Sequence, residues 1–413
     1  MRNRLISLGV ASCLTLLGCA SESTSEPAVA SPTDSSTDEA VVAVASSVAE
    51  PTNPAETTTT VRQLGLINDP RVSPDRDLAP VETCKISDVT TESIDASSGF
   101  PRPESAAPFS DFRLLVVPVS TSDLEFDEDD QQYVIKSLEE TDAFYTYMSS
   151  SQVNLDWKIL DEADRPRFSE SAERLGLIGG PQMTRKPVVE RVADLIASDI
   201  SPETFDALVV YFPADDSILF GEAMQVGFGE EAETIEAVII GGGYTRFWEV
   251  LAHELGHSWL GLEDLYLFES SGMPLGAWDL MQLALLVKGK TLTAWNRWLA
   301  SWIPDSSVRC VSAGSTVHYL TPLSQGVDQP QLVAIPTSES SVIVIESRRA
   351  SNYDEVEPTV IVYSVDTNNR SGFGPFELKA ELTLVGQVEA VGNVAIELVD
   401  QSDEGDLVAV TVG

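Results

Sequence analysis

The sequence predicts a mixed α/β (α+β) domain followed by a small all-β sandwich. In the middle of the chain, apolar segments typical of strands alternate with amphipathic helical segments, which is the element order of an α/β domain. After Pro304 the chain changes to short Val/Ile-rich segments separated by turn residues, as in a sandwich. We therefore assign residues 108–305 to the α/β domain and residues 306–413 to the sandwich domain.

The α/β domain begins with a continuous apolar run at residues 112–119, which we expect to be a buried strand. A helix is expected over residues 129–148, because large apolar side chains recur there on roughly one side. These residues are Tyr133, Leu138, Phe144, Tyr145 and Met148. Residues 153–159 alternate apolar and polar side chains, as a half-buried strand does.

The same alternation of elements continues toward the middle of the chain. A second helix is expected from Pro187 to about Ala197, since proline fits the first turn of a helix. Strands at residues 207–212 and 237–240 then complete a mixed sheet. The following Gly241-Gly242-Gly243 lacks the Lys and Ser/Thr of a phosphate-binding loop, so we interpret it as a turn.

A tryptophan-rich segment at residues 291–303 closes the domain, and its helical spacing predicts packing in the core. The sandwich domain is expected to contain strands at residues 331–335, 341–346, 359–365, 376–385, 394–399 and 407–412. We expect His318 to lie on a strand at the surface. Arg348 and Arg349 are expected either to pair with acids of the α/β domain or to be solvated strand ends.

The segment from His253 to His257 is an HExxH motif. On a helix its two imidazoles lie on one face, which suits a divalent metal ion. Two neutral histidines and a third protein ligand hold Zn²⁺ and leave one position open for water. Glu254 then faces that water and acts as general base, which predicts amide hydrolysis. The alternative is a helix that carries two histidines by accident, although two of the chain's three histidines lie in this motif.

Downstream of the motif, Gly261 is followed by Leu262-Glu263-Asp264-Leu265-Tyr266 and by Gly276-Ala277-Trp278-Asp279-Leu280-Met281. Together with the HExxH motif, these segments resemble the immune inhibitor A family of secreted zinc metallopeptidases, relatives of the metzincins. The resemblance spans roughly residues 110 to 375. It implies a metzincin-like zinc peptidase domain with Asp264 as third zinc ligand and Met281 as the methionine of a turn beneath the site.

The spacing departs from the family pattern by one residue. The family places its glycine three residues and its ligand six residues after the second histidine, whereas Gly261 and Asp264 lie four and seven residues after His257. Asp264 is preferred because the Gly-x-x-Asp-Leu-Tyr spacing is intact. Glu263 preserves the six-residue distance and is the alternative ligand, and both carboxylates suit zinc. A third possibility is that both are solvated turn acids and that the site binds zinc poorly.

The N-terminus predicts export from a bacterial cell. Residues 1–19 resemble a lipoprotein signal peptide whose Cys19 becomes lipidated, the alternative being an ordinary secretory signal. Residues 20–61 contain no basic and no aromatic residue, which predicts a disordered tether. Residues 62–107 are expected to form an extended arm that carries Cys84. The expected location is the cell envelope, as an outer-membrane or cell-surface lipoprotein, or the medium.

Export also bears on the cysteines. Cys13 leaves with the signal and Cys19 carries the lipid, so Cys84 and Cys310 remain and are expected to form a disulfide in an oxidising compartment. In an alternative interpretation the arm is an autoinhibitory propeptide, and the thiolate of Cys84 blocks the zinc ion.

The charge of the chain limits its partners. Acids outnumber basic residues 65 to 25, and a net charge of −40 argues against nucleic acid and anionic membrane surfaces. Contact with a membrane is therefore expected only through the lipid anchor. The acid excess makes Ca²⁺ plausible, but no DxDxDG-type loop is present and no calcium site is assigned.

These observations predict an exported, lipid-anchored zinc metalloendopeptidase that binds a protein or peptide substrate as an added strand at the edge of its sheet. Tyr266 and Tyr244 are candidates for stabilising the oxyanion. Two other functions stay open. One is a surface binding or adhesion lipoprotein that keeps the metallopeptidase fold with an impaired site. The other is a zinc hydrolase of non-peptide amides.

Overall fold

A computed structural model describes residues 69–88, 96–102, 111–177, 185–213, 220–229, 233–242 and 247–413. The predicted signal peptide with Cys19 and the predicted tether lie outside these ranges, as do Gly243 and Tyr244. In the described part of the chain, no helix has both the length and the apolar character needed to cross a membrane.

The first half of the fold is organised around a five-stranded mixed sheet with the strand order β2-β1-β3-β5-β4. Its strands are β1 (Phe112–Pro118), β2 (Leu155–Ile159), β3 (Ala207–Phe212), β4 (Phe220–Phe228) and β5 (Glu233–Gly241). The strands are parallel except β4, which pairs antiparallel with β5 at the sheet edge. The mixed sheet predicted from the sequence is confirmed. Strand β4 was not predicted, because FGEAMQVGF has few of the β-branched residues that favour strands.

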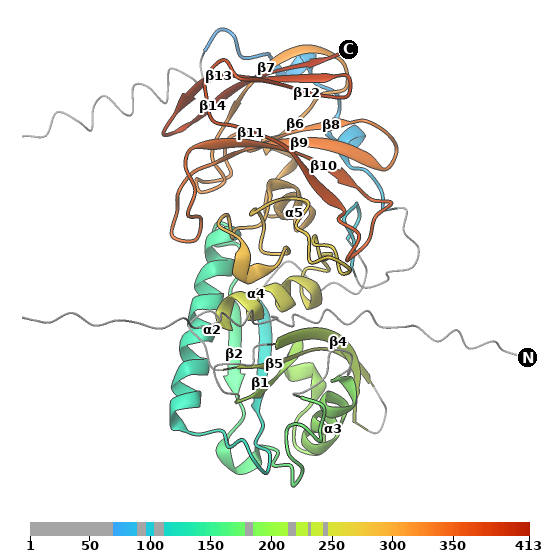
Figure 1. Cartoon of the computed structure of the whole chain (residues 1–413), viewed down its shortest axis with the longest axis vertical. Coiled ribbons are helices and arrows are strands. Elements are labelled where there is room, and N and C mark those ends of the chain that lie inside the picture. Colours follow the sequence, from blue (N-terminus) through green and yellow to red (C-terminus); the bar gives the residue numbers. More distant parts are fainter. Residues whose placement is uncertain are drawn as a thin grey trace, which may run out of the picture.

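Helices cover both faces of this sheet (Figure 1). Helices α2 (Glu128–Met148) and α4 (Phe247–Ser258) pack on one face, and α3 (Lys186–Ile196) packs on the other. Alternate residues of β1 therefore enter two separate apolar clusters, Leu114 on the side of α4 and Leu115 on the side of α3. Burial on both faces explains the unbroken apolar run of β3, as in parallel sheets generally.

Helix α2 begins one residue before the predicted start because of its capping box. The Asp127 side chain accepts the backbone N–H of Asp130 at 3.0 Å, and the Asp130 side chain accepts the N–H of Asp127 at 3.1 Å. The Trp-rich helix is shorter than predicted. Helix α5 (Ala294–Leu299) is followed by Ser301 in the left-handed region, with φ of 61°. Its tryptophans are buried, which confirms the predicted packing in the core.

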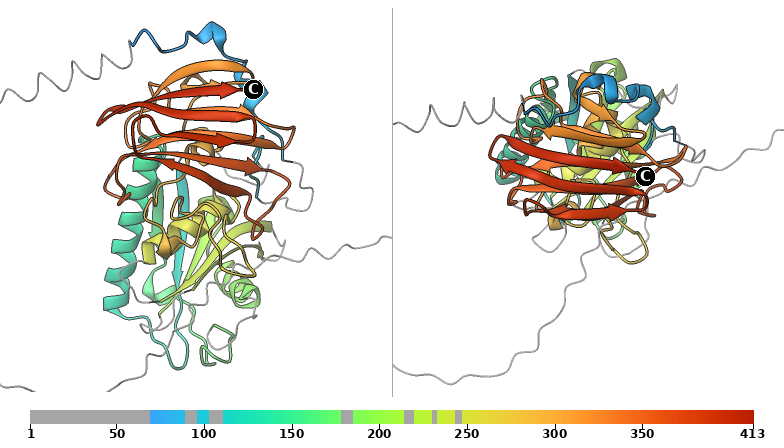
Figure 2. Two further views of the ribbon diagram at one scale, coloured as in Figure 1. Left: turned by 45° about the horizontal axis from the view of Figure 1, so that its top comes forward. Right: turned by 90° about the horizontal axis from the view of Figure 1, so that it is seen from above.

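The C-terminal half is a sandwich of two sheets, visible in Figure 2. One sheet has the order β11-β10-β9-β8-β6 and the other β12-β13-β14-β7. Their strands are β6 (Val308–Cys310), β7 (Gly314–Leu320), β8 (Leu332–Pro336), β9 (Ser341–Arg348), β10 (Thr359–Asp366), β11 (Phe376–Leu382), β12 (Val388–Val391), β13 (Val394–Ser402) and β14 (Gly405–Val412). Apolar side chains from the two sheets form one cluster between them. The predicted sandwich is confirmed, with β6, β7 and β12 in addition to the expected strands.

Three polar residues of the sandwich are more deeply buried than the sequence predicted. His318 lies on strand β7 but is only 2 % exposed, so its predicted surface position is wrong. Its side chain lies on the same side of β7 as Leu320, which belongs to the apolar cluster of the sandwich. Arg348 and Arg349 are also buried, and the acids they pair with belong to the sandwich half: Glu346 and Asp354 for Arg348, and Asp406 for Arg349.

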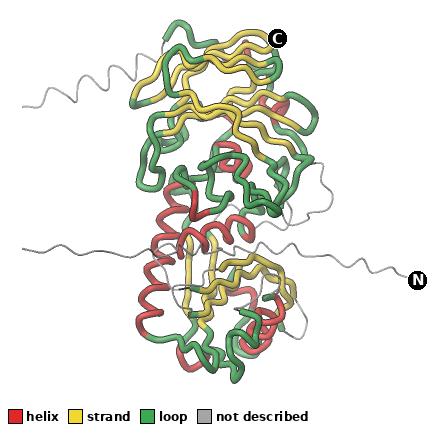
Figure 3. The backbone as a smooth tube through the Cα atoms, in the orientation of Figure 1, coloured by secondary structure: helices red, strands yellow, loops and turns green. Residues whose placement is uncertain are grey.

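The two halves share an apolar core. The outer face of the β11-β10-β9-β8-β6 sheet contributes Val344, Ile361 and Tyr363 to the same cluster that contains Met281 and Trp295. Figure 3 shows the long strands of the sandwich above the helices and loops of this shared region. Because the sheet is covered on both faces, its central strands β9 and β10 are almost entirely buried.

The N-terminal arm follows the sandwich and then reaches the α/β half. A disulfide joins Cys84 to Cys310, as predicted, so Cys84 has no thiolate and cannot block a zinc ion as the propeptide interpretation required. Further along the arm, Phe100 packs against Trp295 and Trp298 with ring centroids 5.4 and 4.7 Å apart. The arm is therefore fixed by packing as well as by the disulfide.

Candidate metal centre

Helix α4 presents the two histidines of the HExxH motif. Its apolar residues Val250, Leu251 and Leu255 belong to the core beneath the helix. The Tyr145 hydroxyl of α2 donates a hydrogen bond of 2.7 Å to the carbonyl of Ala252, which fixes α4 against α2. The helix is thus held on its apolar side, while the two histidines, one turn apart, share another face.

A glycine turn ends α4 and brings the chain back toward the histidines. Gly261 has φ of 61°, in the left-handed region that favours glycine. Its N–H donates to the carbonyl of His257 at 2.9 Å, and the N–H of Leu262 donates to the carbonyl of Gly256 at 3.0 Å. Each bond spans one residue more than the corresponding bond of a Schellman cap. The turn that ends α4 is therefore one residue wider than a Schellman turn.

Three ligand atoms converge after this turn. Asp264 Oδ1 lies 3.1 Å from His253 Nε2 and 3.3 Å from His257 Nε2, and the two Nε2 atoms are 3.3 Å apart. Ligand atoms about 2.0–2.1 Å from a tetrahedral centre lie about 3.3–3.4 Å from one another. The donor triangle therefore has the dimensions that zinc requires. In the described ranges this is the single group of His, Cys, Asp and Glu residues whose ligand atoms converge in this way.

The other ring nitrogens fix the tautomers. His253 Nδ1 lies 2.9 Å from the carbonyl of Leu280, and His257 Nδ1 lies 2.7 Å from the carbonyl of Leu262. Because carbonyl oxygens only accept hydrogen bonds, each Nδ1 carries a proton, and a neutral imidazole in this arrangement has its lone pair on Nε2, the nitrogen that faces Asp264. This is the arrangement in which histidine binds metal ions, with its second nitrogen held by a carbonyl.

The Asp264 carboxylate and the imidazole of His257 shift each other's pKa values. Burial acts to lower the pKa of His257, but the facing Asp264 carboxylate outweighs burial and the pKa rises to about 9. Burial likewise opposes ionisation of Asp264, yet the two histidines bring its pKa below the usual range. His257 keeps 15 % side-chain exposure while His253 and Asp264 keep 1 and 2 %, so solvent reaches the group from the side of His257.

Glu263, the alternative ligand, is directed elsewhere. Its Oε2 accepts the backbone N–H of Ser371 at 2.7 Å and also accepts the Ser371 hydroxyl. The structure thus brings Asp264, and not Glu263, to the two histidines. Both acids are buried, so neither is a solvated turn residue. Ser371 was not identified from the sequence, because it lies 107 residues from Asp264 in a segment that reads as an ordinary turn.

Glu254 lies on the same helix and is fully buried. Neither of its carboxylate oxygens has a hydrogen-bond partner in the described part of the chain. Burial raises the pKa of Glu254, and the neighbouring histidines partly offset that effect. Gly221 of β4 lies directly against Glu254, because a Cβ added at Gly221 would be only 2.6 Å from Glu254 Oε1. A buried carboxyl group with a raised pKa and no hydrogen-bond partner among the described residues can accept or release a proton.

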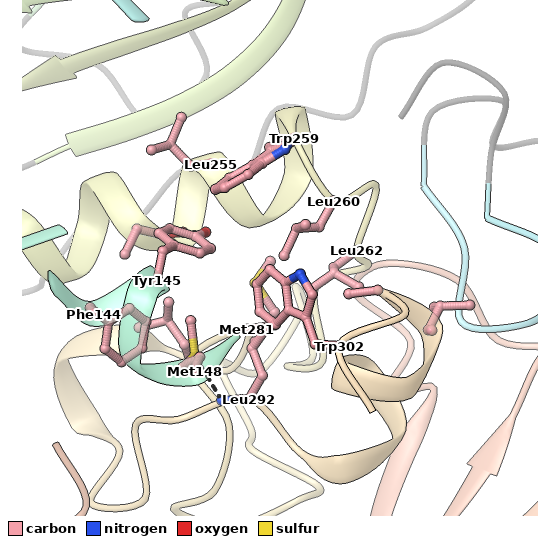
Figure 4. Close-up of a cluster of buried hydrophobic side chains, with 14 of the residues drawn as sticks. Phe144, Tyr145, Met148, Leu255, Trp259, Leu260, Leu262, Met281, Leu292 and Trp302 are labelled. Carbon is pink, nitrogen blue, oxygen red and sulfur yellow. Dashed lines mark hydrogen bonds between the residues drawn. The ribbon is translucent and has the colours of Figure 1, made fainter. Parts of the chain in front are cut away.

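Met281 lies directly beneath α4. Its sulfur would be 2.5 Å from a Cβ at Gly256, so a glycine is required there. Figure 4 shows Met281 among Leu262, Leu292 and Trp302. The turn that carries it is tied together by Asp279, whose carboxylate accepts the N–H groups of Met281 at 2.9 Å and of Thr293 at 2.7 Å.

Of the two tyrosines considered for stabilising the oxyanion, the structure describes only Tyr266. Tyr266 is buried with its ring centroid 6.5 Å from that of His253. Tyr244 lies outside the described residues.

Neither the models of known protein families nor the curated protein sequences gave a match to this chain.

Proposed function

We propose that the protein is an exported zinc metalloendopeptidase with a metzincin-like catalytic domain. The observation that carries this proposal is the 3.1–3.3 Å triangle of His253 Nε2, His257 Nε2 and Asp264 Oδ1, with the unpartnered carboxylate of Glu254 beside it. A bound zinc ion supplies a Lewis acid for the scissile carbonyl and lowers the pKa of the attacking water to about 7.

Within this proposal, His253, His257 and Asp264 hold the ion. Glu254 takes the proton of the attacking water and then delivers it to the leaving amine. Its burial supports this role, because a carboxyl group with a raised pKa accepts and releases a proton near neutral pH more readily than an exposed one. The Leu280 and Leu262 carbonyls keep both imidazoles in the tautomer that binds metal.

The substrate is proposed to be an extended segment of a protein or peptide. Among the residues that the structure describes, strand β4 is the edge strand of its sheet and is paired on one side only, with β5. Gly221 of this strand lies against Glu254. A peptide added to the free edge of β4 would form main-chain hydrogen bonds and pass close to Glu254, which is the common way in which sheet edges bind extended peptides.

The location is proposed to be the bacterial cell envelope, with the lipid on Cys19 as the membrane attachment, or the medium if the signal is an ordinary one. The Cys84–Cys310 disulfide supports an oxidising compartment outside the cytoplasm. The acidity of the chain gives it no attraction to an anionic membrane surface, so the lipid alone provides the proposed attachment.

Metal analysis combined with a casein or fluorescent-peptide assay tests the enzyme proposal. We expect one zinc ion per chain in the wild type and in Glu254→Gln, and peptide hydrolysis in the wild type alone. Zinc without hydrolysis of peptides in either protein would favour a hydrolase of other amides, and absence of both would favour a surface binding lipoprotein.

A further inference from the structure

A loop of the sandwich half reaches the metal centre. The chain between β10 and β11, residues 367–375, is called the β10–β11 loop. Its Gly372 and Phe373 form bridges with Leu267, and the N–H of Phe268 donates to the Gly372 carbonyl at 3.1 Å. A Cβ at Gly372 would lie 2.1 Å from the ring of Phe268. Glycine at this position therefore allows the loop to lie directly against the chain that follows Asp264.

Ser371 of this loop forms a closed set of hydrogen bonds with the two adjacent acids. The Asp264 N–H donates to Ser371 Oγ at 2.8 Å, and the same hydroxyl donates to Glu263 Oε2. The Ser371 N–H donates to Glu263 Oε2 at 2.7 Å. The Ser371 hydroxyl thus accepts a hydrogen bond from the backbone of Asp264 and donates one to the side chain of Glu263. Glu263 fixes the direction of the hydroxyl, and the hydroxyl fixes the backbone of Asp264.

This contact supports the backbone of Asp264 within an irregular segment. Residues 261–265 belong to neither a helix nor a strand. A metal ligand has to be held within about 0.5 Å of its productive position, which normally requires support from neighbouring hydrogen bonds. In the α/β half the N–H of the adjacent Leu265 donates to the Met281 carbonyl at 2.9 Å, and from the sandwich half the Ser371 hydroxyl accepts the N–H of Asp264.

We infer that Ser371 and Glu263 are positioning residues that hold Asp264 in the geometry of a metal ligand. The C-terminal sandwich is then a part of the metal centre, although it contributes no ligand. This inference rests on the proposed function, since it presumes that zinc binds at this site. Glu263, the alternative ligand on sequence grounds, acquires a different role: it orients the serine that supports the true ligand.

Zinc affinity tests the inference, measured by competition with a chromophoric chelator on the full protein. Loss of a group that orients a metal ligand typically weakens binding about 10- to 100-fold. We expect that loss for Ser371→Ala and Glu263→Ala, and no further loss in the double variant, because Glu263 acts on Asp264 only by orienting the Ser371 hydroxyl. Ser371→Thr keeps the hydroxyl and should restore affinity to near the wild-type value.

Ser351→Ala is the matched control. Ser351 lies in the neighbouring β9–β10 connection, and its hydroxyl accepts the N–H groups of Tyr353 at 3.2 Å and of Asp354 at 3.0 Å. We expect wild-type zinc affinity for this variant. The absorption spectrum of the cobalt-substituted protein should change for Ser371→Ala and not for Ser351→Ala, because only the former alters the ligand geometry.

The thermal midpoint of the metal-free proteins separates positioning from general stability. We expect Ser371→Ala and Ser351→Ala to have similar midpoints in excess chelator. Tight zinc binding by the wild type and by Ser371→Ala alike would overturn the positioning role alone. Absence of stoichiometric zinc in the wild type would overturn the proposed function and the positioning role together.

Discussion

His253 Nε2 lies 3.1 Å from Asp264 Oδ1, although a helix end and a left-handed glycine turn separate the two residues. The contact depends on the turn at Gly261, which reverses the chain after α4. It also depends on the loop of the sandwich that supports Asp264 from the other side. The predictions below follow from these two supports and from the buried groups around them.

The first prediction concerns the turn itself. Gly261→Ala places a Cβ at φ of 61°, which costs about 1–2 kcal/mol in the left-handed region. The chain can relieve that strain by rotating Asp264 away from the histidines, so we expect zinc affinity to fall at least about tenfold together with the thermal midpoint. Zinc competition and thermal unfolding measure the two effects.

Gly392→Ala is the control for this strain. Gly392 has φ of 62° and no atom within 4 Å of its added Cβ, and it lies in the β12–β13 turn. It should lower stability by a similar amount and leave zinc affinity unchanged. Equal zinc affinity in the two variants would contradict the role assigned to the Gly261 turn.

The second prediction concerns the approach of β4 to Glu254. In Gly221→Ala the new methyl group would lie 2.6 Å from Glu254 Oε1, so the carboxylate has to move. We expect peptide hydrolysis to fall by at least about 10²-fold, since general acid–base catalysis contributes about 10²–10⁴-fold. Zinc content should stay at one per chain, because the atoms nearest to the new methyl group belong to Glu254 and Val250.

Gly326→Ala is the control for this test, because a Cβ added at Gly326 would have no atom within 4 Å. Its kcat and zinc content should equal those of the wild type. Retention of full activity by Gly221→Ala would show that Glu254 does not act from the position described.

The third prediction concerns the pH dependence of stability. Burial lowers the pKa of His318 to about 4, and Arg309 adds to the effect. Between this value and the ordinary value of about 6.5, the unfolded chain binds a proton that the folded chain does not. The contribution of neutral His318 is therefore fully present above about pH 6.5 and is lost as the pH falls toward 4.

Urea unfolding at pH 7 and pH 4.5 measures this effect against His318→Gln, which has no titratable group. On the basis of about 1.4 kcal/mol per pKa unit, the wild type should lose about 2 kcal/mol more than the variant between the two pH values. Parallel losses in both proteins would show that the histidine is not buried in its neutral form.

The fourth prediction concerns the turn beneath α4. Met281→Ala removes a buried side chain that lies against Gly256, and such truncations cost about 2–5 kcal/mol. The carbonyl of Leu280, which orients His253, belongs to the same turn, so we also expect weaker zinc binding. Met281→Leu keeps the volume and should recover most of both losses; failure to do so would show that volume alone does not explain the methionine.

Local patterns carried most of what could be predicted. Helix α4 and its histidines follow from the HExxH spacing. The preference for Asp264 over Glu263 came from the resemblance of the Gly-x-x-Asp-Leu-Tyr segment to the immune inhibitor A pattern, in which a glycine turn directs a nearby acid to the metal. The alternation of apolar residues likewise predicted β2 and the amphipathic face of α2.

The remaining features depend on contacts between distant segments. Ser371 lies 107 residues from Asp264, and no local pattern relates them. His318 reads as an exposed strand residue, since Thr316 beside it is polar, yet a second sheet covers both. Arg348 reads as a solvated strand end but is enclosed by Glu346 and Asp354. In each case tertiary packing determines the environment of the side chain.

Anomalous diffraction at the zinc edge, from crystals grown with zinc, locates the ion and identifies its ligands. We expect one strong peak about 2.0–2.2 Å from His253 Nε2, His257 Nε2 and Asp264 Oδ1, with Glu263 still bonded to Ser371. A peak coordinated by Glu263 in place of Asp264, or no peak between the two histidines, would contradict this expectation.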